Sequence, residues 1–589
     1  MEKWMMKNIK ADFNGFASAL NVSPILGKLL INRDIYNLKD AEKFLNPSLE
    51  VLNSPLDLKD MDKAINLIKE HIDENKKILI VGDYDVDGVI STYILFSGLS
   101  DFEANVDYHI PDRINEGYGI NESIIRKAKE MNVDLIVTCD NGIAALDQIK
   151  LAKELGLKVI VTDHHDISFI ENESGHRDYV LPLADAVINP KRSDCNYSFK
   201  KLCGAGIAFK LIQALYIKRG KEEKEAFKYL EFAAIATVCD VVDLVDENRI
   251  IVRNGLAMIN STKNIGLKAL IQEVGLEEKE IGAYHLGFII GPSINATGRL
   301  ESAIIALKLL LAKEEQSARE LAERLHNLNI ERQNITSEGL EKAIDIIESS
   351  SLIRDNVLVV YIPEVHESVA GIIAGRIREK YNLPSIVLTK AQEGVKGSGR
   401  SIEGYNMFEE LLKCKHLLAK FGGHPMAAGL SLEESNIDRL REELNKNCTL
   451  TEEDIMPEVN IDMQMNFKDI TLELAEEISY LEPYGKANSK PNFAEKSISV
   501  QRATVLGKNK NVLKLKLYSR KSNKFMEAVY FGDIEKFNDL IVEKYGRDIL
   551  ERIYNGDNNP VLLDLVFNIG INEYLGNRSI QLIVTNYRL

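Results

Sequence analysis

The segment "ILIVGDYDVDGVIST", Ile78 to Thr92, carries three aspartates within five positions, namely Asp83, Asp85 and Asp87. Four apolar residues run up to Gly82, so the pattern predicts a buried parallel strand that ends in a loop and leads into a helix. Open α/β sheets bind ligands beyond the carboxyl ends of their strands. Carboxylates this close together repel one another, and a hard divalent cation would compensate that repulsion. The segment therefore predicts a metal site.

Three further segments place acids or imidazoles after apolar runs. "LIVTCDNG" ends on Asp140, "VIVTDHH" brings Asp163, His164 and His165, and "AAIATVCDVVDL" places Asp240 at the end of a helix-like run. Taken singly, each has a structural explanation as a turn residue, a helix cap or a core histidine. Taken together, they predict that the fold gathers acids and imidazoles at one edge of a sheet.

The donor types indicate which ions such a site would hold. Carboxylates with histidine suit Mn²⁺ or Mg²⁺, and the six cysteines form no CxxC pair, which argues against a zinc cage. Cys139 and Cys239 precede two of the acids, and we expect them to point away from the site. The carboxylates exceed what one ion needs, so we expect two cations, about 3.5–4 Å apart, that clamp a phosphate and activate water. Phosphoester hydrolysis is the leading reaction class.

Several elements must position these residues. Strands and helices alternate from about residue 77 to 245, which predicts a doubly wound α/β sheet. Residues 301 to 350 have helical periodicity typical of long connecting helices, residues 355 to 448 return to mixed α/β, and short strands from about 455 predict a small β-barrel. The predicted division is an N-terminal segment 1–60, a catalytic domain 61–300, connecting helices 301–352, a second α/β domain 353–450 and a barrel 455–589.

The composition is that of an ordinary globular protein of several domains, with 589 residues, of which 45% are hydrophobic and 28% charged. The first residues form a poor signal peptide, and no apolar run approaches the length of a membrane span. Together with unpaired cysteines, this predicts a cytoplasmic protein without membrane contact. The net charge of −16 argues mildly against a general nucleic-acid coat protein, but local patches matter more than the sum.

The barrel segment carries a local patch of positive charge. From residue 501 to 526 there are eight Lys or Arg residues and no acid. Lys514 and Lys516 alternate with leucines, so the strand would have one apolar and one basic face. Aromatic residues follow closely at Tyr518, Phe525, Tyr530 and Phe531. Basic grooves with stacking aromatics bind single-stranded nucleic acid, although an ordinary solvated face over core aromatics is the alternative.

The motifs "DYDVDG", "TCDNG", "DHH" and "TVCDVV" resemble, in this order, the four motifs of the DHH phosphoesterase superfamily. "GSGRS" (397–401) and "FGGHPMAAG" (421–429) resemble its associated DHHA1 domain. With "IPDR" (110–113), "NATGR" (295–299) and the β-rich tail, nearly the whole chain resembles the RecJ family, bacterial exonucleases that degrade single-stranded DNA from the 5′ end. The resemblance implies a DHH catalytic domain joined by long helices to a DHHA1 domain, followed by an OB-like barrel.

The resemblance also implies roles for individual residues. The implied metal ligands are Asp83, Asp85, Asp140, His164 and Asp240, with Asp140 as the bridge. His165 would face the scissile phosphate, Asp163 would orient a neighbouring side chain, and Asp87 would be a loop or supporting residue. The residues implied to hold the terminal 5′ phosphate are Arg113, Arg299, Ser398 and Arg400, with His424 available to a phosphate or base.

Both DHHA1 motifs also have structural explanations, namely a flexible turn with a solvated arginine for "GSGRS" and a tight turn before a helix for "FGGHPMAAG". "GSGRS" has Gly399 where relatives usually have alanine. The chain also departs from the family pattern in "VHESVAGIIAGR", where His366 remains but the preceding aromatic residue and the following Pro-Gly do not. Because of this departure, the resemblance does not define the substrate channel around His366.

Three functions compete on the sequence. The first is a metal-dependent 5′-to-3′ exonuclease for single-stranded DNA in repair and recombination, with two Mn²⁺ or Mg²⁺ ions. The alternatives are a DHH phosphodiesterase for short oligonucleotides or cyclic dinucleotides, and an inactive replication scaffold. The resemblance implies a monomer that works with a helicase and a single-strand-binding protein.

Overall fold

The computed structural model describes residues 2–171, 177–391, 394–507, 509–574 and 576–589. The chain divides into two compact units: one comprises residues 52–242 and 250–456, and the other comprises residues 1–51, 243–249 and 457–589. No helix in the described ranges is both long and apolar enough to cross a membrane. All six cysteines are unbridged thiols.

A five-stranded parallel sheet opens the first unit. Its strands lie in the order β3-β2-β4-β5-β8, and every neighbouring pair is parallel. The strands are β2 (Ile78–Val81), β3 (Val106–His109), β4 (Leu135–Cys139), β5 (Lys158–Thr162) and β8 (Ala186–Ile188). The strand order reverses direction between β2 and β4, so the carboxyl ends of these two strands border the crevice in which such sheets bind ligands.

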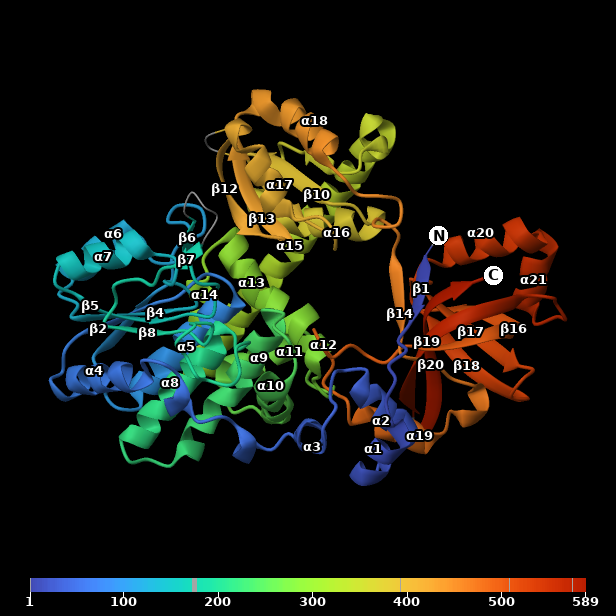
Figure 1. The fold of residues 1–589 in the computed structure, drawn as a ribbon, viewed down its shortest axis with the longest axis horizontal. Coiled ribbons are helices and arrows are strands. Elements are labelled where there is room, and N and C mark those ends of the chain that lie inside the picture. The colour runs from blue at the N-terminus through green and yellow to red at the C-terminus, as the bar shows by residue number, and fades with distance from the viewer. Residues whose placement is uncertain (1, 172–176, 392–393, 508, 575) are drawn as a thin grey trace. The chain divides into compact units, whose positions relative to one another are not determined.

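Helices cover both faces of this sheet, which is why every residue of its central strands β2 and β4 is buried (Figure 1). On one face lie α6 (Glu122–Glu130) and α7 (Leu146–Glu154), and on the other lie α4 (Met61–Asp73), α5 (Val86–Ser100) and α8 (Gly204–Lys218). All four residues of β2 are buried. The predicted doubly wound sheet is therefore confirmed, and it positions the loop after β2 at the crevice.

A helical region follows the sheet. It contains α9 (Leu230–Cys239), α10 (Asp246–Ile259), α11 (Ile265–Glu273), α12 (Ala283–His285), a π-helical turn (Leu286–Ile290), α13 (Gly291–Leu300), α14 (Ile304–Leu310) and α15 (Glu315–Ser349). The predicted connecting helices are mainly the single helix α15, which has 35 residues and is about 50 Å long. Helix α15 packs against both α13 and α16 (Ala370–Tyr381), so it joins the two α/β parts of this unit.

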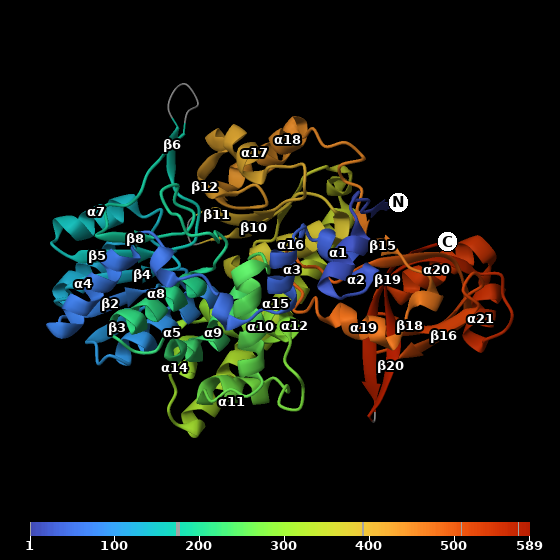
Figure 2. The same cartoon turned by 60° about the horizontal axis from the view of Figure 1, so that its bottom comes forward.

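The second α/β part contains a mixed sheet in the order β12-β13-β11-β10-β9. Its strands are β9 (Leu358–Tyr361), β10 (Ser385–Lys390), β11 (Val395–Arg400), β12 (Leu418–His424) and β13 (Ala427–Leu432). Helices α17 (Met407–Lys413) and α18 (Ile437–Asn447) lie on one face and α16 on the other (Figure 2). "FGGHPMAAG" forms the β12–β13 hairpin, so its alternative explanation as a turn before a helix is wrong.

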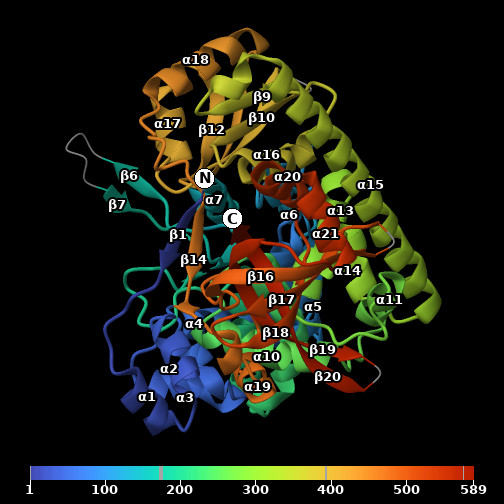
Figure 3. The ribbon, with the colours of Figure 1, turned by 90° about the vertical axis from the view of Figure 1, so that its right-hand side faces the viewer.

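The second unit contains a closed barrel of five strands, which confirms the predicted OB-like domain (Figure 3). The strands are β16 (Phe493–Leu506), β17 (Val512–Ser519), β18 (Lys524–Tyr530), β19 (Leu562–Tyr574) and β20 (Asn577–Arg588). Strand β19 pairs with both β20 and β16, which closes the barrel, and β18 runs parallel to β20. Helices α20 (Ile534–Tyr545) and α21 (Arg547–Asn555), which the strand pattern did not predict, separate β18 from β19.

The N-terminal segment belongs to the same compact unit as the barrel. Its helices α1 (Phe13–Leu20), α2 (Pro24–Ile31) and α3 (Leu38–Leu45) are short, and β1 (Lys3–Met6) pairs with β14 (Glu458–Ile461). Apolar residues of α2 and α3, such as Leu30 and Phe44, join the buried cluster that contains Phe493 and Phe567 of the barrel. The predicted division into five segments stays a prediction.

Candidate metal centre and phosphate pocket

The loop after β2 and the first turn of α5 hold the first two aspartates. Asp83 follows Gly82 at the end of the strand, and its Oδ1 accepts a hydrogen bond from the Gly119 amide at 3.3 Å. Asp85 is the N-cap of α5, and its carboxylate accepts a hydrogen bond from the Gly88 amide at 3.0 Å. These backbone donors fix both carboxylates at the carboxyl end of β2.

Asp140 stands at the carboxyl end of the neighbouring strand β4. Its φ of 61° lies in the left-handed region, which few residues other than glycine, Asn and Asp adopt. The Asn141 side chain donates hydrogen bonds to the carbonyls of Val81 (3.0 Å) and Cys139 (2.9 Å), which ties the ends of β2 and β4 together. A Cβ on Gly204 would lie 2.7 Å from the Asp140 Cβ, so the start of α8 can approach only as glycine.

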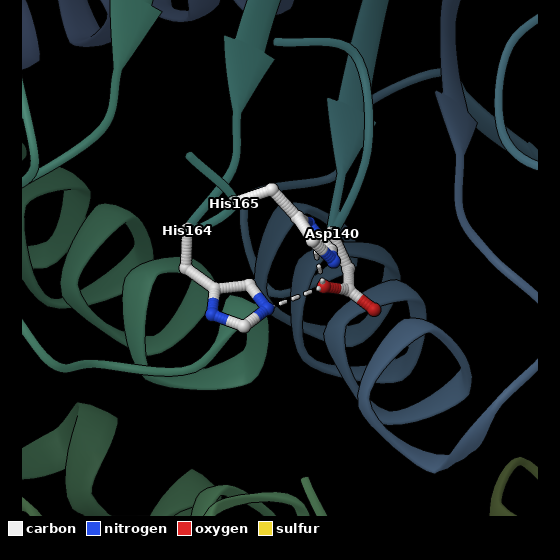
Figure 4. Close-up of side chains that lie close together, drawn as sticks. All are labelled: Asp140, His164 and His165. Carbon is white, nitrogen blue, oxygen red and sulfur yellow. Dashed lines mark ion pairs between the residues drawn. The ribbon is translucent and has the colours of Figure 1, made fainter. Parts of the chain in front are cut away.

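His164 and Asp240 complete the cluster around Asp140. His164 Nε2 lies 3.1 Å from Asp140 Oδ1, and His165 Nδ1 lies 3.9 Å from the same oxygen (Figure 4). His164 Nε2 also lies 3.7 Å from an oxygen of Asp240. Asp240 is the C-cap of α9, so a helix end delivers this acid, whereas the other acids follow strands or the loop after β2.

Asp87 is fully buried beside the same cluster. Its two carboxylate oxygens accept hydrogen bonds from the amides of Gly204 (2.6 Å) and Ala205 (2.7 Å), at the start of α8. One of them lies 3.7 Å from His164 Nε2. Asp87 therefore anchors a helix that packs against the cluster.

Asp163 holds His165 in place. His165 Nδ1 donates to Asp163 Oδ1 at 2.8 Å, while Asp163 Oδ2 accepts a hydrogen bond from the Ile143 amide. Burial lowers the pKa of His165, but the Asp163 carboxylate outweighs it and brings that pKa to about 9. In the metal-free chain, Asp163 therefore favours the protonated form of His165. The sequence analysis missed Tyr118, whose hydroxyl donates to the Asp140 carbonyl at 2.8 Å and lies 3.4 Å from His165 Nδ1.

Burial and mutual repulsion shape the charge of the cluster. Burial, followed by the charge of Asp87, raises the pKa of Asp240 to about 8, and the same two causes raise the pKa of Asp140. Burial and the charge of Asp85 raise the pKa of Asp83. Burial and the nearby His165 lower the pKa of His164 to about 3, so its imidazole is neutral. Carboxyl groups held this close to one another and to a neutral imidazole bind either protons or a metal cation.

Three buried side-chain atoms without a hydrogen-bond partner test whether a metal ion fits this cluster. Asp140 Oδ1, His164 Nε2 and Asp240 Oδ2 are buried, and in the described part of the chain none makes a hydrogen bond with acceptable geometry. Three groups offer ligand atoms that lie within 4.8 Å of one another: Asp83, Asp85 and Asp140; Asp140, His164 and His165; and Asp87, His164 and Asp240. Asp140 belongs to two of the three groups. These oxygen and imidazole donors suit Mn²⁺ or Mg²⁺.

A cavity of about 520 Å³ brings together the four residues predicted to hold a terminal phosphate, namely Arg113, Arg299, Ser398 and Arg400. The Arg113 guanidinium stacks over the Tyr84 ring at 4.8 Å, and Arg299 donates to the Ser368 carbonyl at 2.6 Å. Arg400 donates to Ser398 Oγ at 2.9 Å. Tyr84 also lines the cavity, so the cavity adjoins the loop that carries Asp83 and Asp85.

The arginines of this cavity make no close ion pair among the described residues. Within the described ranges, none of the three guanidinium groups has a carboxylate oxygen within 4.0 Å. Burial and then repulsion from Arg113 lower the pKa of Arg299 to about 10, and the same causes lower the pKa of Arg400. A bound anion would relieve both effects, and guanidinium groups bind phosphate in a bidentate manner.

Further residues line the cavity that sequence reasoning missed. Lys396 alternates with Ser398 and Arg400 along β11, and this period of two could have identified it. Lys396 pairs with Glu367 at 3.0 Å. Lys420 and Phe421 of β12 reach the cavity from a distant part of the sequence, so no local pattern indicated them.

His424, which was predicted to contact the substrate, and His366 of the altered segment do not line the cavity. His424 ends β12 and is exposed, and its Nδ1 lies 4.0 Å from an oxygen of Asp166. His366 Nδ1 lies 2.7 Å from Ser368 Oγ and caps a short 3₁₀ helix. In the altered segment, His366 therefore supports the backbone that accepts the hydrogen bond from Arg299.

The basic strand of the barrel has the predicted alternation. Leu513, Leu515 and Leu517 are buried, and Lys516 is exposed with its Nζ 5.3 Å from the Phe525 ring centroid. Phe525 lies against Tyr518 with the ring centroids 4.6 Å apart. The same face also carries an acid, because Lys514 pairs with Glu527 at 2.9 Å. Of the basic residues counted in this segment, Lys508 lies outside the described residues.

Family models match three parts of the chain in order. Residues 77–237 match the DHH family, N-terminal domain, residues 354–449 match the DHHA1 domain, and residues 461–586 match the RecJ OB domain. These matches confirm the resemblance that the sequence motifs indicate.

Curated relatives of this chain are named single-stranded-DNA-specific exonuclease RecJ. The chain is 39% identical over 507 residues to the single-stranded-DNA-specific exonuclease RecJ of Bacillus subtilis, which covers 85% of this chain but only 62% of that relative's length. It is 33% identical to the RecJ of Haemophilus influenzae, over 98% of this chain and 99% of that one. The RecJ of Escherichia coli is 31% identical, over 96% and 95%.

Solved structures resemble the fold as well. RecJ from Thermus thermophilus in complex with Mn²⁺ superposes with a TM-score of 0.81 at 26% identity, covering 100% of this chain and 79% of that one. The complex of the same protein with Mg²⁺ gives a TM-score of 0.76 at 26% identity, covering 100% and 78%.

The first prediction concerns the buried charge of Asp240 in metal-free protein. Its pKa is about 8 in the folded chain and near 4 when unfolded, so between these values the folded chain binds more protons. The free energy of unfolding should therefore fall as the pH rises from about 4 to about 8. Asp240→Asn removes this loss, and we expect its melting temperature in chelator to exceed that of the wild type by several degrees at pH 8 but not at low pH.

Thermal unfolding with chelator across this pH range measures the effect, and Asp539→Asn at an exposed site is the control. Parallel curves for the wild type and Asp240→Asn would contradict the prediction.

Proposed function

The chain belongs to the RecJ family of single-stranded-DNA-specific exonucleases, and on that premise we propose that it is a metal-dependent enzyme that hydrolyses single-stranded DNA from the 5′ end. The observation that carries the proposal is the juxtaposition of two oppositely charged sites within one compact unit. An acid–imidazole cluster lies beside a cavity lined by arginines, and Tyr84 belongs to both the metal loop and the cavity.

We assign two divalent cations, Mn²⁺ or Mg²⁺, to the cluster. Asp83, Asp85 and Asp140 would hold one, and Asp140, His164 and Asp240 would hold the other. Asp140 and His164 each belong to two of the three ligand groups, and of these only the carboxylate of Asp140 has two oxygens with which to serve two ions, which supports its assignment as the bridge. The solved relatives with Mn²⁺ and with Mg²⁺ support the choice of ions. When bound, such a pair of ions polarises the phosphate and lowers the pKa of an attacking water.

The residues around the ligands have separate tasks. His165, oriented by its hydrogen bond to Asp163, is available to donate a hydrogen bond to the scissile phosphate. Asp87 is already engaged by two amides of α8, which supports a role in holding the cluster together. Tyr118 restrains the backbone of Asp140 through its hydroxyl.

The arginine cavity would set the direction of cleavage. Arg113, Arg299 and Arg400, with Ser398, would bind the terminal 5′ phosphate, because their charges lack a carboxylate partner. A strand anchored by its terminal phosphate presents a bond at a set distance from that end to the neighbouring metal centre. Degradation would then proceed from 5′ to 3′.

The barrel would hold the strand beyond the catalytic unit. Lys516 can neutralise a phosphate, while Phe525 and Tyr518 present aromatic rings to bases on the same strand pair. Stacking on aromatic side chains is worth about 1–3 kcal/mol per base and tolerates any sequence.

We further propose a cytoplasmic monomer that acts in DNA repair and recombination on strands supplied by a helicase, alongside a single-strand-binding protein. The unbridged cysteines and the family membership support this setting.

Asp140→Ala should abolish hydrolysis while the protein stays folded. The variant loses the bridging carboxylate, so we expect both ions to be lost and turnover to fall by at least about 10³-fold, since several kcal/mol of charge stabilisation disappear. Calorimetric Mn²⁺ titration and single-strand degradation measure the two effects. Asp163→Asn is the matched control, which should keep both ions and slow turnover. Near-normal turnover of Asp140→Ala in Mn²⁺ would refute the two-ion assignment.

The proposed direction is tested with long single strands labelled at either end and carrying a 5′ phosphate or a 5′ hydroxyl. We expect the wild type to release mononucleotides from the 5′ end and to prefer the phosphate. The activity of Arg400→Ala should fall about 10- to 100-fold on strands with a 5′ phosphate, as expected when hydrogen bonds to a charged group are lost. It should change little on strands with a 5′ hydroxyl.

The exposed Arg376→Ala is the control for this test. Equal losses of Arg400→Ala on both kinds of end would contradict the phosphate-pocket role. Wild-type cleavage of a dinucleotide without degradation of long strands would favour the short-substrate phosphodiesterase.

Lys516→Gln should weaken the binding of long single strands and flatten its salt dependence. Each phosphate contact contributes about 0.7 to the log–log salt slope for single strands. Lys514→Gln should change the slope less, because Glu527 already neutralises this lysine, and it is therefore the matched comparison. Affinity measured against salt tests both variants, and cleavage of short oligonucleotides should stay unchanged. A slope that both variants leave unaltered would mean that this face is only solvated.

A further inference from the structure

Two aromatic residues stand exposed on the surface of the catalytic unit. Tyr284 is 65% exposed and Phe288 is 66% exposed, yet their rings are stacked on each other with centroids 4.8 Å apart and an interplanar angle of 23°. Their spacing of four residues places them on one side of a helix. Single exposed apolar residues are common, whereas a stacked and solvent-exposed pair can extend its stack, because the outer face of either ring can accept a further planar ligand.

The helical segment that carries this pair contacts the end of α9, which leads to a proposed metal ligand. Tyr284 is in α12 and Phe288 is in the π-helical turn that follows it, a form of helix found frequently at functional sites. The turn rests on the end of α9, because Cys239 Sγ donates to the Leu286 carbonyl at 3.4 Å. The residue after Cys239 is the proposed ligand Asp240. The aromatic pair is thus attached to the segment that delivers a metal ligand.

The same helix also reaches the phosphate cavity. Helix α12, the π-helical turn and α13 follow one another without a break, and Arg299 stands near the end of α13. Arg299 lies eleven positions after Phe288, which corresponds to about 16 Å along a helix. Between them, Asn295 Oδ1 accepts a hydrogen bond from the Val86 amide at 3.2 Å, which ties the helix to the metal loop. One continuous helical segment therefore carries a pocket arginine at one end and the aromatic pair at the other.

We propose that Tyr284 and Phe288 form a stacking platform for bases of the substrate strand on the 3′ side of the cleaved bond. This inference rests on the proposed function, in which the terminal phosphate occupies the arginine cavity and the cleaved bond lies at the metal centre. The strand continues past Asp240 and reaches the platform. Recognition is by stacking, which every base supports, so the platform holds the strand without sequence preference.

A protein partner is the competing occupant of this surface. The continuity of the helix with Arg299 and its contact with the end of α9 favour the nucleic acid, because both connect the platform to sites that bind the same strand. A partner-binding surface would not need to lie on the element that carries a substrate ligand.

The test compares the double variant Tyr284→Ala/Phe288→Ala with the wild type and with Tyr284→Trp/Phe288→Trp, which restores stacking. Binding of long 5′-phosphorylated single-stranded DNA is measured by fluorescence anisotropy in chelator, independently of cleavage. Turnover in Mn²⁺ is measured on a 5′-phosphorylated dinucleotide and on long strands. A series of strands with one abasic position, moved stepwise from the 5′ end, locates the stacked base.

We expect the alanine variant to lose about 5- to 100-fold in affinity for long strands, as the loss of one stacked base predicts. Cleavage of the dinucleotide should stay unchanged, and the tryptophan variant should bind as the wild type does. An abasic position should weaken wild-type binding only where it faces the platform, and that position should have no effect in the alanine variant. Tyr480→Ala, at a site 55% exposed, is the control.

Two results would overturn the platform. Wild-type affinity of the alanine variant for long strands would show that the pair does not hold the strand and would leave the protein partner as its occupant. Equal losses on the dinucleotide and on long strands would show that the pair supports the metal centre. A wild type that binds long strands through the platform but releases no nucleotide from the 5′ end would refute the proposed function and leave the platform standing.

Discussion

The arrangement of this chain depends on negative charge held in a dry environment. Burial raises the pKa of Asp83, Asp140 and Asp240, and each of these carboxylates feels at least one other aspartate at close range. Such a cluster opposes folding unless a cation compensates it. The surrounding structure must therefore hold the acids in place by other means, and it does so with backbone amides, the Asn141 side chain and the start of α8.

The cavity beside the cluster has the opposite imbalance. Arg113, Arg299 and Arg400 repel one another in a space that excludes a good part of the solvent. An acid–imidazole cluster and an arginine-lined cavity thus adjoin at Tyr84, although the chain as a whole carries a net charge of −16. A phosphodiester strand is a ligand that satisfies both, because its terminal phosphate is an anion and its internal phosphates bind metal ions. The overall charge of the chain gives no hint of this, since the relevant charges are local.

Sequence reasoning reached the parts of this site whose signals are local. Asp83, Asp140 and His164 follow apolar runs, and the topology of a parallel sheet then brings them to one edge. Asp240 was identified as well, although it ends a helix. The residues that were missed contact the site through the tertiary fold: Tyr118 reaches Asp140 from a loop, and Lys420 and Phe421 enter the cavity from a distant hairpin. The packing of α2 and α3 into the core of the barrel was missed for the same reason, because it joins the two ends of the chain.

The backbone of Asp140 has a consequence for how this fold can diverge. A φ of 61° is accessible to Asp, Asn and glycine but strained for most other residues. The position that would join the two cations therefore admits few replacements without backbone strain, and the simplest of these, asparagine, keeps the shape and removes the charge. In a gene copy freed from selection for hydrolysis, this replacement would remove the chemistry and leave the architecture intact. Inactive descendants of such an enzyme should therefore be recognisable by an intact sheet with an amide in place of this acid.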